Sequence, residues 1–217
     1  CSGIGKIMGR KSLERGCSKL IIWDINEEGL NKTKEEFSKL GGEIFIYKVD
    51  ISNLDEIKIN AQKVRTEAGS VDILINNAGV FFFNPYCETS MKRIELMLQL
   101  HMITVAKMTR LFGEDMMKRE LTEEEAKQRI CGRKRMRGYI LNMSSMSAWM
   151  AMPGIQTYNA TKAFIYNFSK SIWYEFKPKN VGVTVMAPGA VDTALFGLAP
   201  HLRKLAVALT VSIPPEK

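Results

Sequence analysis

Three side chains in the second half of the chain could together move a proton to or from an oxygen atom. Tyr158 and Lys162 stand four residues apart, and Ser145 lies thirteen residues before Tyr158. In a helix, positions i and i+4 share a face, so the phenol and the ammonium would project together. A nearby positive charge lowers the pKa of a Tyr, and a Ser hydroxyl could hold a carbonyl or alcohol oxygen beside it. The set predicts acid–base chemistry at a carbon–oxygen bond, although this Tyr–Lys spacing alone also occurs in ordinary surface or core helices.

Short β-type runs alternate with longer helical patterns, which predicts βαβ units and a parallel sheet covered on both faces. The runs at 20–23 and 71–75 are almost wholly apolar, as expected for strands buried on both faces. Glycines at 16 and 41–42 stand where helix C-caps are expected. The predicted strands are 19–23, 43–49, 71–76, 139–143 and 181–186, and the predicted helices are 5–15, 27–40, 54–68, 88–118 and 157–177.

The order of these elements indicates a doubly wound α/β sheet whose first strand is absent from the sequence as given. Residues 3–5 open a helix, and no strand-like run precedes them. In a sheet of order 3-2-1-4-5-6 the first strand is central, so without it the first two runs would be separated from the last three. We therefore expect the intact protein to contain this strand, and the end at 214–217 also looks early for such a sheet.

The length and composition fit a single domain with a sizeable core. Of the 217 residues, 46% are hydrophobic and 25% are charged, an ordinary globular profile. No apolar run approaches the length of about 18 residues that could span a bilayer, and we expect a cytoplasmic protein without a membrane span. The four cysteines lack paired spacing, which favours free thiols, and with two histidines and no Cys/His cluster no metal site is expected.

A glycine-containing turn near the start of the chain could bind a pyrophosphate. In Ser2-Gly3-Ile4-Gly5, glycines allow close backbone approach, and the helix that follows offers N–H donors and a positive dipole. Asp24 ends the next predicted strand about twenty residues on, where a carboxylate can accept hydrogen bonds from an adenosine ribose. Residues 24–27 are equally an ordinary helix N-cap, and both roles can hold together.

Asp24 also bears on the choice of cofactor. A carboxylate at this point repels a ribose 2′-phosphate and accepts hydrogen bonds from a free ribose diol. The next residue is Ile25 rather than a basic side chain. If the nucleotide bound here is a nicotinamide dinucleotide, Asp24 therefore favours NAD(H), with NADP(H) as the alternative.

Taken in order, these motifs resemble the short-chain dehydrogenase/reductase family, with some likeness to its ketoacyl reductase and hydroxysteroid dehydrogenase members. The resemblance implies a Rossmann fold and hydride transfer between a nicotinamide cofactor and a carbonyl or secondary alcohol. The matching motifs are Ser2-Gly3-Ile4-Gly5, Asp24, Asp50-Ile51, Asn76-Asn77-Ala78-Gly79, Asn142-Met143-Ser144-Ser145, Tyr158-x-x-x-Lys162 and Pro188-Gly189-x-Val191-x-Thr193.

The resemblance also implies a role for each motif. Tyr158 would be the acid/base, Ser145 would orient the substrate oxygen, and Lys162 would bind the nicotinamide ribose and lower the pKa of Tyr158. The turns at 76–79 and 188–189 would serve as turns after strands in any case. The implied cofactor-binding residues are Ser2, Gly3, Ile4, Gly5, Asp24, Asp50, Ile51, Asn77, Ala78, Gly79, Tyr158, Lys162, Pro188, Gly189, Val191 and Thr193.

The chain departs from the family pattern at His101, where the family often has an Asn that helps to hold a water beside the Lys. An imidazole can also hydrogen-bond a water or a carbonyl, so we expect either that His101 replaces this Asn in the catalytic set or that it is a helix histidine without a catalytic role. If it has no such role and the cofactor binds without turnover, the protein would be regulatory rather than catalytic.

A second departure is a long, basic link between the fourth predicted helix and the fourth predicted strand. Residues 118–137 carry eight Lys/Arg and four Glu, in a chain of net charge +8. The segment could bind nucleic acid or an anionic surface, but no aromatic residue interleaves it for base stacking. We therefore favour a solvated helical excursion and expect no nucleic-acid partner.

Apolar, methionine-rich residues between Ser145 and Tyr158 would line the substrate cleft, together with residues 194–198 and 202–211. They predict a bulky apolar carbonyl or alcohol as substrate, or else they pack the core or a subunit interface. The resemblance implies a homodimer or homotetramer that pairs the last two helices. The cleft residues are Met146, Trp149, Met150, Met152 and Gln156, and the outer faces of the paired helices include Met91, Leu98, Phe164, Phe168 and Trp173.

Overall fold

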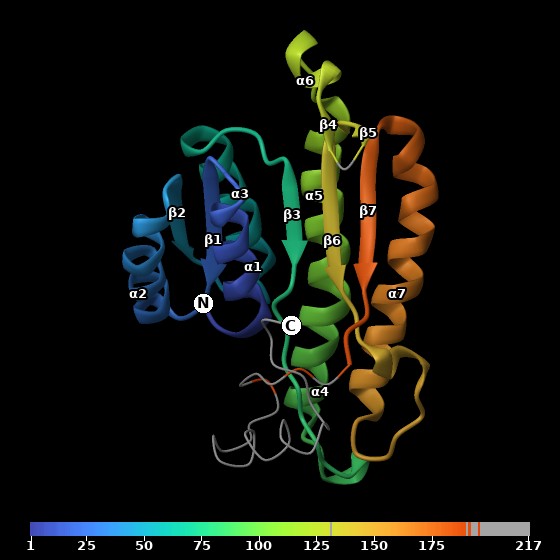
Figure 1. Ribbon diagram of the computed structural model, residues 1–217. Coiled ribbons are helices and arrows are strands. Elements are labelled where there is room, and N and C mark those ends of the chain that lie inside the picture. The colour runs from blue at the N-terminus through green and yellow to red at the C-terminus, as the bar shows by residue number, and fades with distance from the viewer. Residues whose placement is uncertain (131, 190, 192–194, 196–217) are drawn as a thin grey trace. The chain divides into compact units, whose positions relative to one another are not determined.

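The computed structural model describes residues 1–130, 132–189, 191 and 195 (Figure 1). These residues form two compact units, and each is described by itself. The first unit contains Cys1–Gly69, Val80–Phe82 and the described residues from 188 onward. The second contains Ser70–Gly79 and Phe83–Ala187. The expectation of a single domain stays a prediction.

The first unit is built on two parallel strands, β1 (Lys19–Asp24) and β2 (Glu43–Lys48), in a register that runs from Lys19 opposite Glu43 to Asp24 opposite Lys48. Helices α1 (Gly3–Glu14) and α2 (Glu27–Phe37) contact β1, and α2 also packs on β2. A 3₁₀ turn, η1 (Ser38–Leu40), follows α2, and α3 (Leu54–Glu67) follows β2. The buried core of this unit includes Leu13, Leu30, Phe37, Ile57, Ala61 and Val64.

Side-chain caps explain where two of these helices begin. The Asn26 side chain accepts the backbone N–H of Gly29 at 3.0 Å at the start of α2. The Asn53 side chain accepts the N–H groups of Asp55 and Glu56 at the start of α3. Such caps satisfy backbone donors that have no partner within the helix. Asn26, rather than Asp24, is therefore the N-cap of α2.

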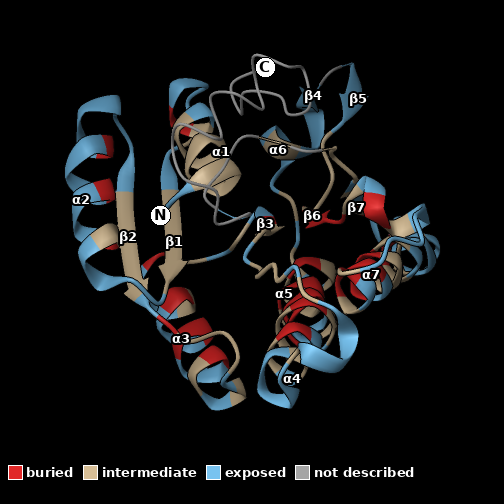
Figure 2. Cartoon of the chain, turned by 90° about the horizontal axis from the view of Figure 1, so that it is seen from below, coloured by how far each residue is buried: buried red, intermediate tan, exposed pale blue. Residues whose placement is uncertain are grey.

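The second unit contains three parallel strands in the order β3 (Ile73–Asn76), β6 (Gly138–Met143), β7 (Val181–Met186). Helix α5 (Val105–Lys118) packs on β3 and β6, α7 (Gln156–Phe176) packs on β6 and β7, and the two helices touch each other. Both therefore cover the same face of the three strands, and both helices contain buried residues (Figure 2). A 3₁₀ turn, η5 (Lys177–Lys179), joins α7 to β7.

Glycine permits the close approach of α5 to the end of α7. A Cβ atom placed on Gly113 would lie 2.5 Å from the Phe176 ring, closer than van der Waals contact allows. Phe176 and Ile140, the two side chains nearest to this point, are buried. Even a methyl group at residue 113 would therefore displace part of this core.

A continuous helical run precedes α5. Helix α4 (Met91–Leu98) passes into a π-helical segment, η3 (Gln99–Thr104), and then into α5. The sequence predicted a single helix over 88–118, and the π-helical turns were not predicted. Such turns are rare and occur often at functional sites. The loop before α4 contains a short 3₁₀ turn, η2 (Tyr86–Glu88).

The basic excursion is a folded element. It contains a short helix, α6 (Glu123–Lys127), and an antiparallel ribbon of β4 (Arg129–Ile130) and β5 (Arg133–Lys134). The prediction of a helical, solvated segment was therefore right for α6, whereas the ribbon is solvated but not helical.

Charged side chains anchor this excursion. Arg119 forms ion pairs with both Asp72 and Glu125. Arg135 lies 2.9 Å from the Glu125 carboxylate and 3.4 Å from that of Asp72. Five cations of residues 118–137 remain exposed, namely Lys118, Lys127, Arg129, Arg133 and Lys134.

The predicted strands and helices agree with the structure to within a few residues at their ends. Apart from the β4–β5 ribbon, the described strands pair in two groups, β1 with β2 and β3 with β6 and β7, as expected from the order of the strand-like runs. The glycines at 16, 41 and 42 have positive φ angles, as expected for caps. No described helix has the length and apolar character needed to cross a bilayer.

Candidate active site

Helix α7 brings Tyr158 and Lys162 together in the second unit. Both side chains are buried, with 7% and 6% of their surface exposed. The Lys162 Nζ atom lies 5.4 Å from the centroid of the Tyr158 ring. It also donates a hydrogen bond to the Met143 carbonyl at 2.9 Å. The ammonium is therefore fixed between the end of β6 and the phenol.

Reciprocal contacts hold the end of β6 against α7. The Ser144 hydroxyl donates to the Lys162 carbonyl at 2.7 Å, and the Lys162 ammonium donates to the Met143 carbonyl. Ser144 is buried, as is Met143. The strand and the helix are thus linked from side chain to backbone in both directions.

Ser145 stands directly after these residues, at the N-cap of a 3₁₀ turn, η4 (Met146–Trp149). Its hydroxyl oxygen accepts the backbone N–H of Ser147 at 3.2 Å. A side-chain hydrogen bond also joins Ser145 to Tyr158. The structure thus places the predicted Ser, Tyr and Lys in one cluster.

Burial is the main cause of the pKa shifts of Tyr158 and Lys162. It raises the pKa of Tyr158 above its ordinary value, and the hydrogen bond from Ser145 only partly opposes that rise. Burial also lowers the pKa of Lys162 to about 8. The predicted lowering of the Tyr158 pKa is therefore not found for the described residues, because loss of solvent outweighs the hydrogen bond from Ser145.

His101 lies beside Tyr158 from the π-helical segment. The two rings meet edge to face, with 5.7 Å between their centroids. His101 is 1% exposed, and its Nδ1 atom is 2.9 Å from the Thr161 hydroxyl oxygen. Burial first, and then the charge of Lys162, lower the pKa of His101 to about 3, so the imidazole is neutral near pH 7.

Hydrogen bonds of two side-chain amides, the half-buried Asn76 and the buried Asn142, connect the ends of β3 and β6. The Asn76 side chain donates to Asn142 at 2.8 Å and to Thr109 at 3.2 Å. The Asn142 side chain donates in turn to Ser169 on α7 at 2.9 Å. The Asn76 amide therefore joins neighbouring elements, and Asn77, Ala78 and Gly79 form the turn that follows it.

Sequence reasoning missed Thr161 and Ser169. Thr161 is one of the unspecified positions between Tyr158 and Lys162, and its hydroxyl donates to the Tyr158 carbonyl at 2.8 Å. The sequence did contain an indication of this contact. Thr161 lies three residues after Tyr158, and a Thr hydroxyl in a helix can donate a hydrogen bond to a backbone carbonyl of the preceding turn.

In the first unit, the predicted pyrophosphate turn is the N-terminus of α1. Ser2 occupies the N-cap without a side-chain cap bond. Gly3 has a φ of +55°, a left-handed conformation that glycine adopts most readily. Ile4 and Gly5 follow within the first turn of the helix.

The first unit also holds the two predicted adenosine contacts. The Asp24 carboxylate accepts the Asn26 N–H at 2.9 Å. The Asp50 carboxylate accepts the N–H and the hydroxyl of Ser52 at 2.9 and 2.7 Å, and it thereby closes a turn. Ile51 is half-buried beside it.

The last predicted motif is described only in part. Pro188, Gly189 and Val191 are half-buried residues of the first unit. Thr193 lies outside the described residues, as do 194, 196–198 and 202–211.

Four apolar side chains of the predicted substrate cleft are exposed in the second unit. Met146, Trp149, Met150 and Met152 are 53%, 59%, 46% and 40% exposed. These four side chains therefore do not pack in the core of the second unit. Gln156 is exposed as well, and the Trp149 ring packs edge to face on Tyr166, 4.6 Å between centroids.

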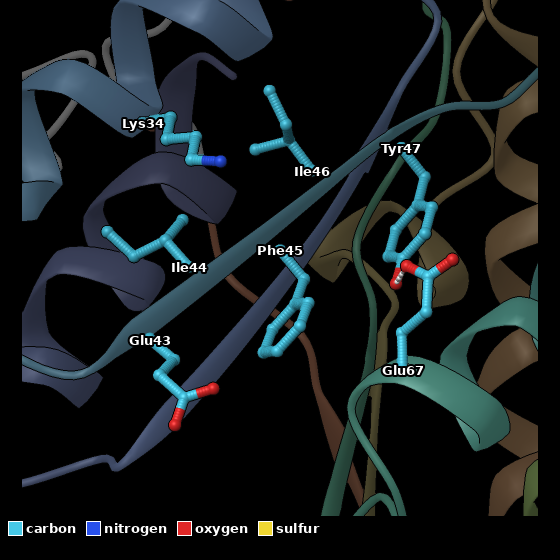
Figure 3. Close-up of a pocket in the computed structure, with 7 residues that line it drawn as sticks. All are labelled: Lys34, Glu43, Ile44, Phe45, Ile46, Tyr47 and Glu67. Carbon is cyan, nitrogen blue, oxygen red and sulfur yellow. Dashed lines mark hydrogen bonds between the residues drawn. The ribbon is translucent and has the colours of Figure 1, made fainter.

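A pocket of about 410 Å³ lies over β2 in the first unit. Figure 3 shows its lining, in which the Tyr47 hydroxyl donates to Glu67 at 2.7 Å. None of the site residues predicted from the sequence lines this pocket. Its lining residues are Lys34, Glu43, Ile44, Phe45, Ile46, Tyr47 and Glu67.

Comparison with known proteins shows a family match over most of the chain. A family model described as short chain dehydrogenase matches residues 1–201. "Probable oxidoreductase EphD" of Mycobacterium tuberculosis (strain ATCC 25618 / H37Rv) is 28% identical over 195 residues, which are 88% of this chain and 30% of that protein. "Estradiol 17-beta-dehydrogenase 11" of Homo sapiens is 27% identical over 203 residues, which are 92% of this chain and 60% of that protein. The chain thus spans less than two thirds of the length of these relatives.

Solved structures show the same fold. A short-chain dehydrogenase from Sphingobium yanoikuyae in complex with NADPH has a TM-score of 0.76 at 21% identity, over 90% of this chain and 70% of that one. A putative gluconate 5-dehydrogenase from Beutenbergia cavernae with bound NADP has a TM-score of 0.80 at 23% identity, over 99% and 81%. An NAD⁺-bound xylitol dehydrogenase has a TM-score of 0.75 at 20% identity, over 94% and 70%. At such identities the likeness establishes the Rossmann-type α/β fold alone.

Proposed function

Because the chain belongs to the short chain dehydrogenase family, we propose that it is an oxidoreductase that transfers a hydride between a nicotinamide cofactor and a carbonyl or secondary alcohol. The observation that carries this proposal is the buried cluster of Ser145, Tyr158 and Lys162, joined by a hydrogen bond and a short ammonium–ring distance. The cluster can move a proton at an oxygen while a hydride moves at the adjacent carbon.

The residues divide this work by their chemistry. A bound nicotinamide supplies the hydride for reduction and accepts it in oxidation. Tyr158 gives its phenolic proton to the carbonyl oxygen during reduction and takes it back from the alcohol during oxidation. Ser145 donates a hydrogen bond to that oxygen, and Lys162 stabilises the phenolate that exists between the two states.

The described residues suit a nicotinamide cofactor. An ammonium has three N–H donors. Among the described residues, the Met143 carbonyl is the only acceptor of a hydrogen bond from the Lys162 ammonium. The diol of a nicotinamide ribose would supply further acceptors. In the first unit, the twelve-residue helix α1 and the left-handed Gly3 provide the N–H groups and the space that a pyrophosphate needs.

The test of this function is turnover with a panel of alcohols and ketones, using NAD(H) and NADP(H). We expect Tyr158→Phe to abolish turnover while cofactor binding, measured by nicotinamide fluorescence, persists. The matched control is Tyr174→Phe, because Tyr174 lies on the same helix and is 71% exposed. Cofactor binding without turnover on any substrate would favour the alternative, a regulatory protein that binds the cofactor.

We infer a preference for NAD(H), which rests on Asp24 at the end of β1. Its carboxylate would accept the ribose hydroxyls and would repel a 2′-phosphate. Catalytic efficiency with the two cofactors tests this role, and Asp24→Ser should reduce the preference. Glu28→Gln is the matched control, since Glu28 is an exposed carboxylate paired with Lys32 in the same unit. A wild-type preference for NADP(H) would contradict the role of Asp24.

We also infer a bulky apolar substrate. The support is the exposed Met146, Trp149 and Met150, which directly follow Ser145. Trp149→Ala should raise the KM for a bulky apolar alcohol more than for a small one. Ile59→Ala, at a 57% exposed position on α3, serves as control. Activity confined to small polar sugars would overturn this assignment.

We further propose that two copies pair through α4, α5 and α7, as the family resemblance implies. Met91 is 69% exposed and Leu98 is 37% exposed, while Phe164 and Phe168 stack on the outer part of α7, 5.4 Å between centroids. Light scattering with size-exclusion chromatography should show a dimer or tetramer, and Met91→Glu should weaken it. A wild-type monomer at micromolar concentration would exclude this pairing.

A further inference from the structure

The hydrogen bonds around Thr161 determine which nitrogen of His101 carries the proton. A Thr hydroxyl has one hydrogen to donate, and the Thr161 hydroxyl donates it to the Tyr158 carbonyl at 2.8 Å. Its oxygen can therefore only accept in the 2.9 Å contact with the His101 Nδ1 atom. A neutral imidazole has a single N–H, so this proton is on Nδ1 and the Nε2 atom is an acceptor.

The Nε2 side of the ring faces Gly79, in the turn after β3. A Cβ atom built on Gly79 would lie 2.6 Å from Nε2 and 3.2 Å from Cδ2 of His101. Any side chain at residue 79 would therefore collide with the imidazole. The ring is thus enclosed between this turn on one side and Thr161 of α7 on the other.

We infer that His101 is a positioning residue that holds the Gly79 turn and the Tyr158 turn of α7 at a fixed separation, with Thr161 as its partner. The inference rests on the proposed function only in that Gly79 belongs to the motif implied to bind the cofactor. Tyr158 gains a fixed backbone through the Thr161 hydrogen bond, and its ring gains an edge contact from the imidazole.

The same geometry argues against the proton-relay role that the sequence left open. A relay group has to gain and lose a proton near the working pH, and the low pKa of this buried imidazole prevents that. The charged or titratable groups that face it, Lys162 and Tyr158, do not offset the effect, because the ammonium also disfavours a second positive charge. His101 therefore acts through its shape and its two fixed hydrogen-bonding roles.

A double-mutant cycle between Gly79 and His101 tests the steric part of this inference. Gly79→Ala alone should weaken cofactor binding at least tenfold, measured by fluorescence titration, and should lower the Tm. In the His101→Ala background the same change should have little effect, because the imidazole that it would strike is gone. Additive effects of the two substitutions would overturn the inference.

The tautomer provides a readout that is independent of activity and of folding defects in variants. The chain has only two histidines, His101 and His201, so ¹⁵N-histidine labelling of the wild-type protein, with His201→Gln for assignment, isolates the His101 signals. We expect a protonated Nδ1 and an unprotonated Nε2 throughout the range from pH 5 to pH 9. An Nε2–H tautomer, or titration of the ring near pH 6, would refute the positioning role.

Thr161 supplies the conservative pair of variants. Thr161→Ser keeps the hydroxyl and should leave the Nδ1–H tautomer and the cofactor KM within about twofold of wild type. Thr161→Val removes the hydroxyl oxygen that accepts from His101 and leaves the buried Nδ1–H without an acceptor. The cofactor KM should therefore rise by a larger factor than kcat falls. Equal behaviour of the two variants would show that the hydroxyl has no positioning role. If the tautomer and the Gly79 coupling hold but no substrate turns over, the proposed function fails and the positioning role stands.

Discussion

Replacement of Lys162 by Met is the most direct test of the electrostatics of the cluster. Methionine keeps most of the volume of the buried stem and removes the ammonium. The charge lies 5.4 Å from the Tyr158 ring centroid. For a phenolate charge at a comparable separation, two unit charges interact by about 3 kcal/mol at an effective dielectric constant of about 20. Loss of that interaction corresponds to roughly two orders of magnitude in the ease of forming the phenolate.

The assay is kcat for alcohol oxidation at saturating cofactor, followed as a function of pH. We expect Lys162→Met to lower kcat by about 100-fold near neutral pH, with a smaller deficit at high pH, where the phenolate forms without help. Cofactor affinity is measured separately by fluorescence, because Lys162 is also proposed to bind the ribose.

Lys170 provides the matched control on the same helix. Its Nζ atom lies 5.2 Å from the centroid of the Tyr166 ring, but Lys170 is exposed, and solvent screens such a charge. Lys170→Met should change kcat by less than about twofold, a surface-charge effect. An equal loss in both variants, or no loss for Lys162→Met at saturating cofactor, would refute the argument that a buried charge stabilises the phenolate.

Three further predictions follow from the packing and burial of the site. Ser145→Ala should lower kcat by about 10² to 10³ with little change in cofactor affinity, because it removes a donor to the developing oxyanion; an unchanged kcat would remove Ser145 from the mechanism. Gly113→Ala should destabilise the protein by about 1–3 kcal/mol in urea unfolding through overlap with Phe176, and Phe176→Leu in the same chain should relieve part of that cost. The folded-state pKa of Lys162, lowered to about 8, predicts that stability rises with pH between about 8 and 10.4, because the unfolded chain binds the extra proton there. Comparison of the pH dependence of unfolding for wild type and Lys162→Met isolates this contribution, and parallel curves would contradict it.

The alternation of apolar runs and amphipathic segments was sufficient to predict the strands and helices, because burial of those runs determines where they lie. The apolar strand β7 was predicted at its observed bounds, Val181–Met186. The ribbon of β4 and β5 was missed because its strands are two residues long and exposed, so no hydrophobic period marks them. The π-helical segment that carries His101 was missed because no glycine or proline signals it.

The sequence was sufficient to identify the residues of the site but not the direction of their pKa shifts. Spacing was enough to place Tyr158 and Lys162 on one helical face, since that depends only on helix geometry. The direction of the Tyr158 pKa depends on how much water surrounds the phenol, and a sequence does not contain that quantity. Thr161 was missed for a related reason, because its importance depends on His101, which is 60 residues away in the chain.

The reciprocal links between Ser144, Lys162 and Met143 have a consequence for motion during turnover. Two buried hydrogen bonds tie the end of β6 to α7 in both directions, so these elements are expected to move as one rigid body. Any opening that admits substrate then has to come from segments without such buried hydrogen bonds. The nearest in the chain is η4, which has exposed Met146 and Trp149 and contacts α7 through the Trp149–Tyr166 ring pair. The proton donor would stay still while the wall of its cleft moves, and substrate exchange would leave the Tyr158–Lys162 distance unchanged.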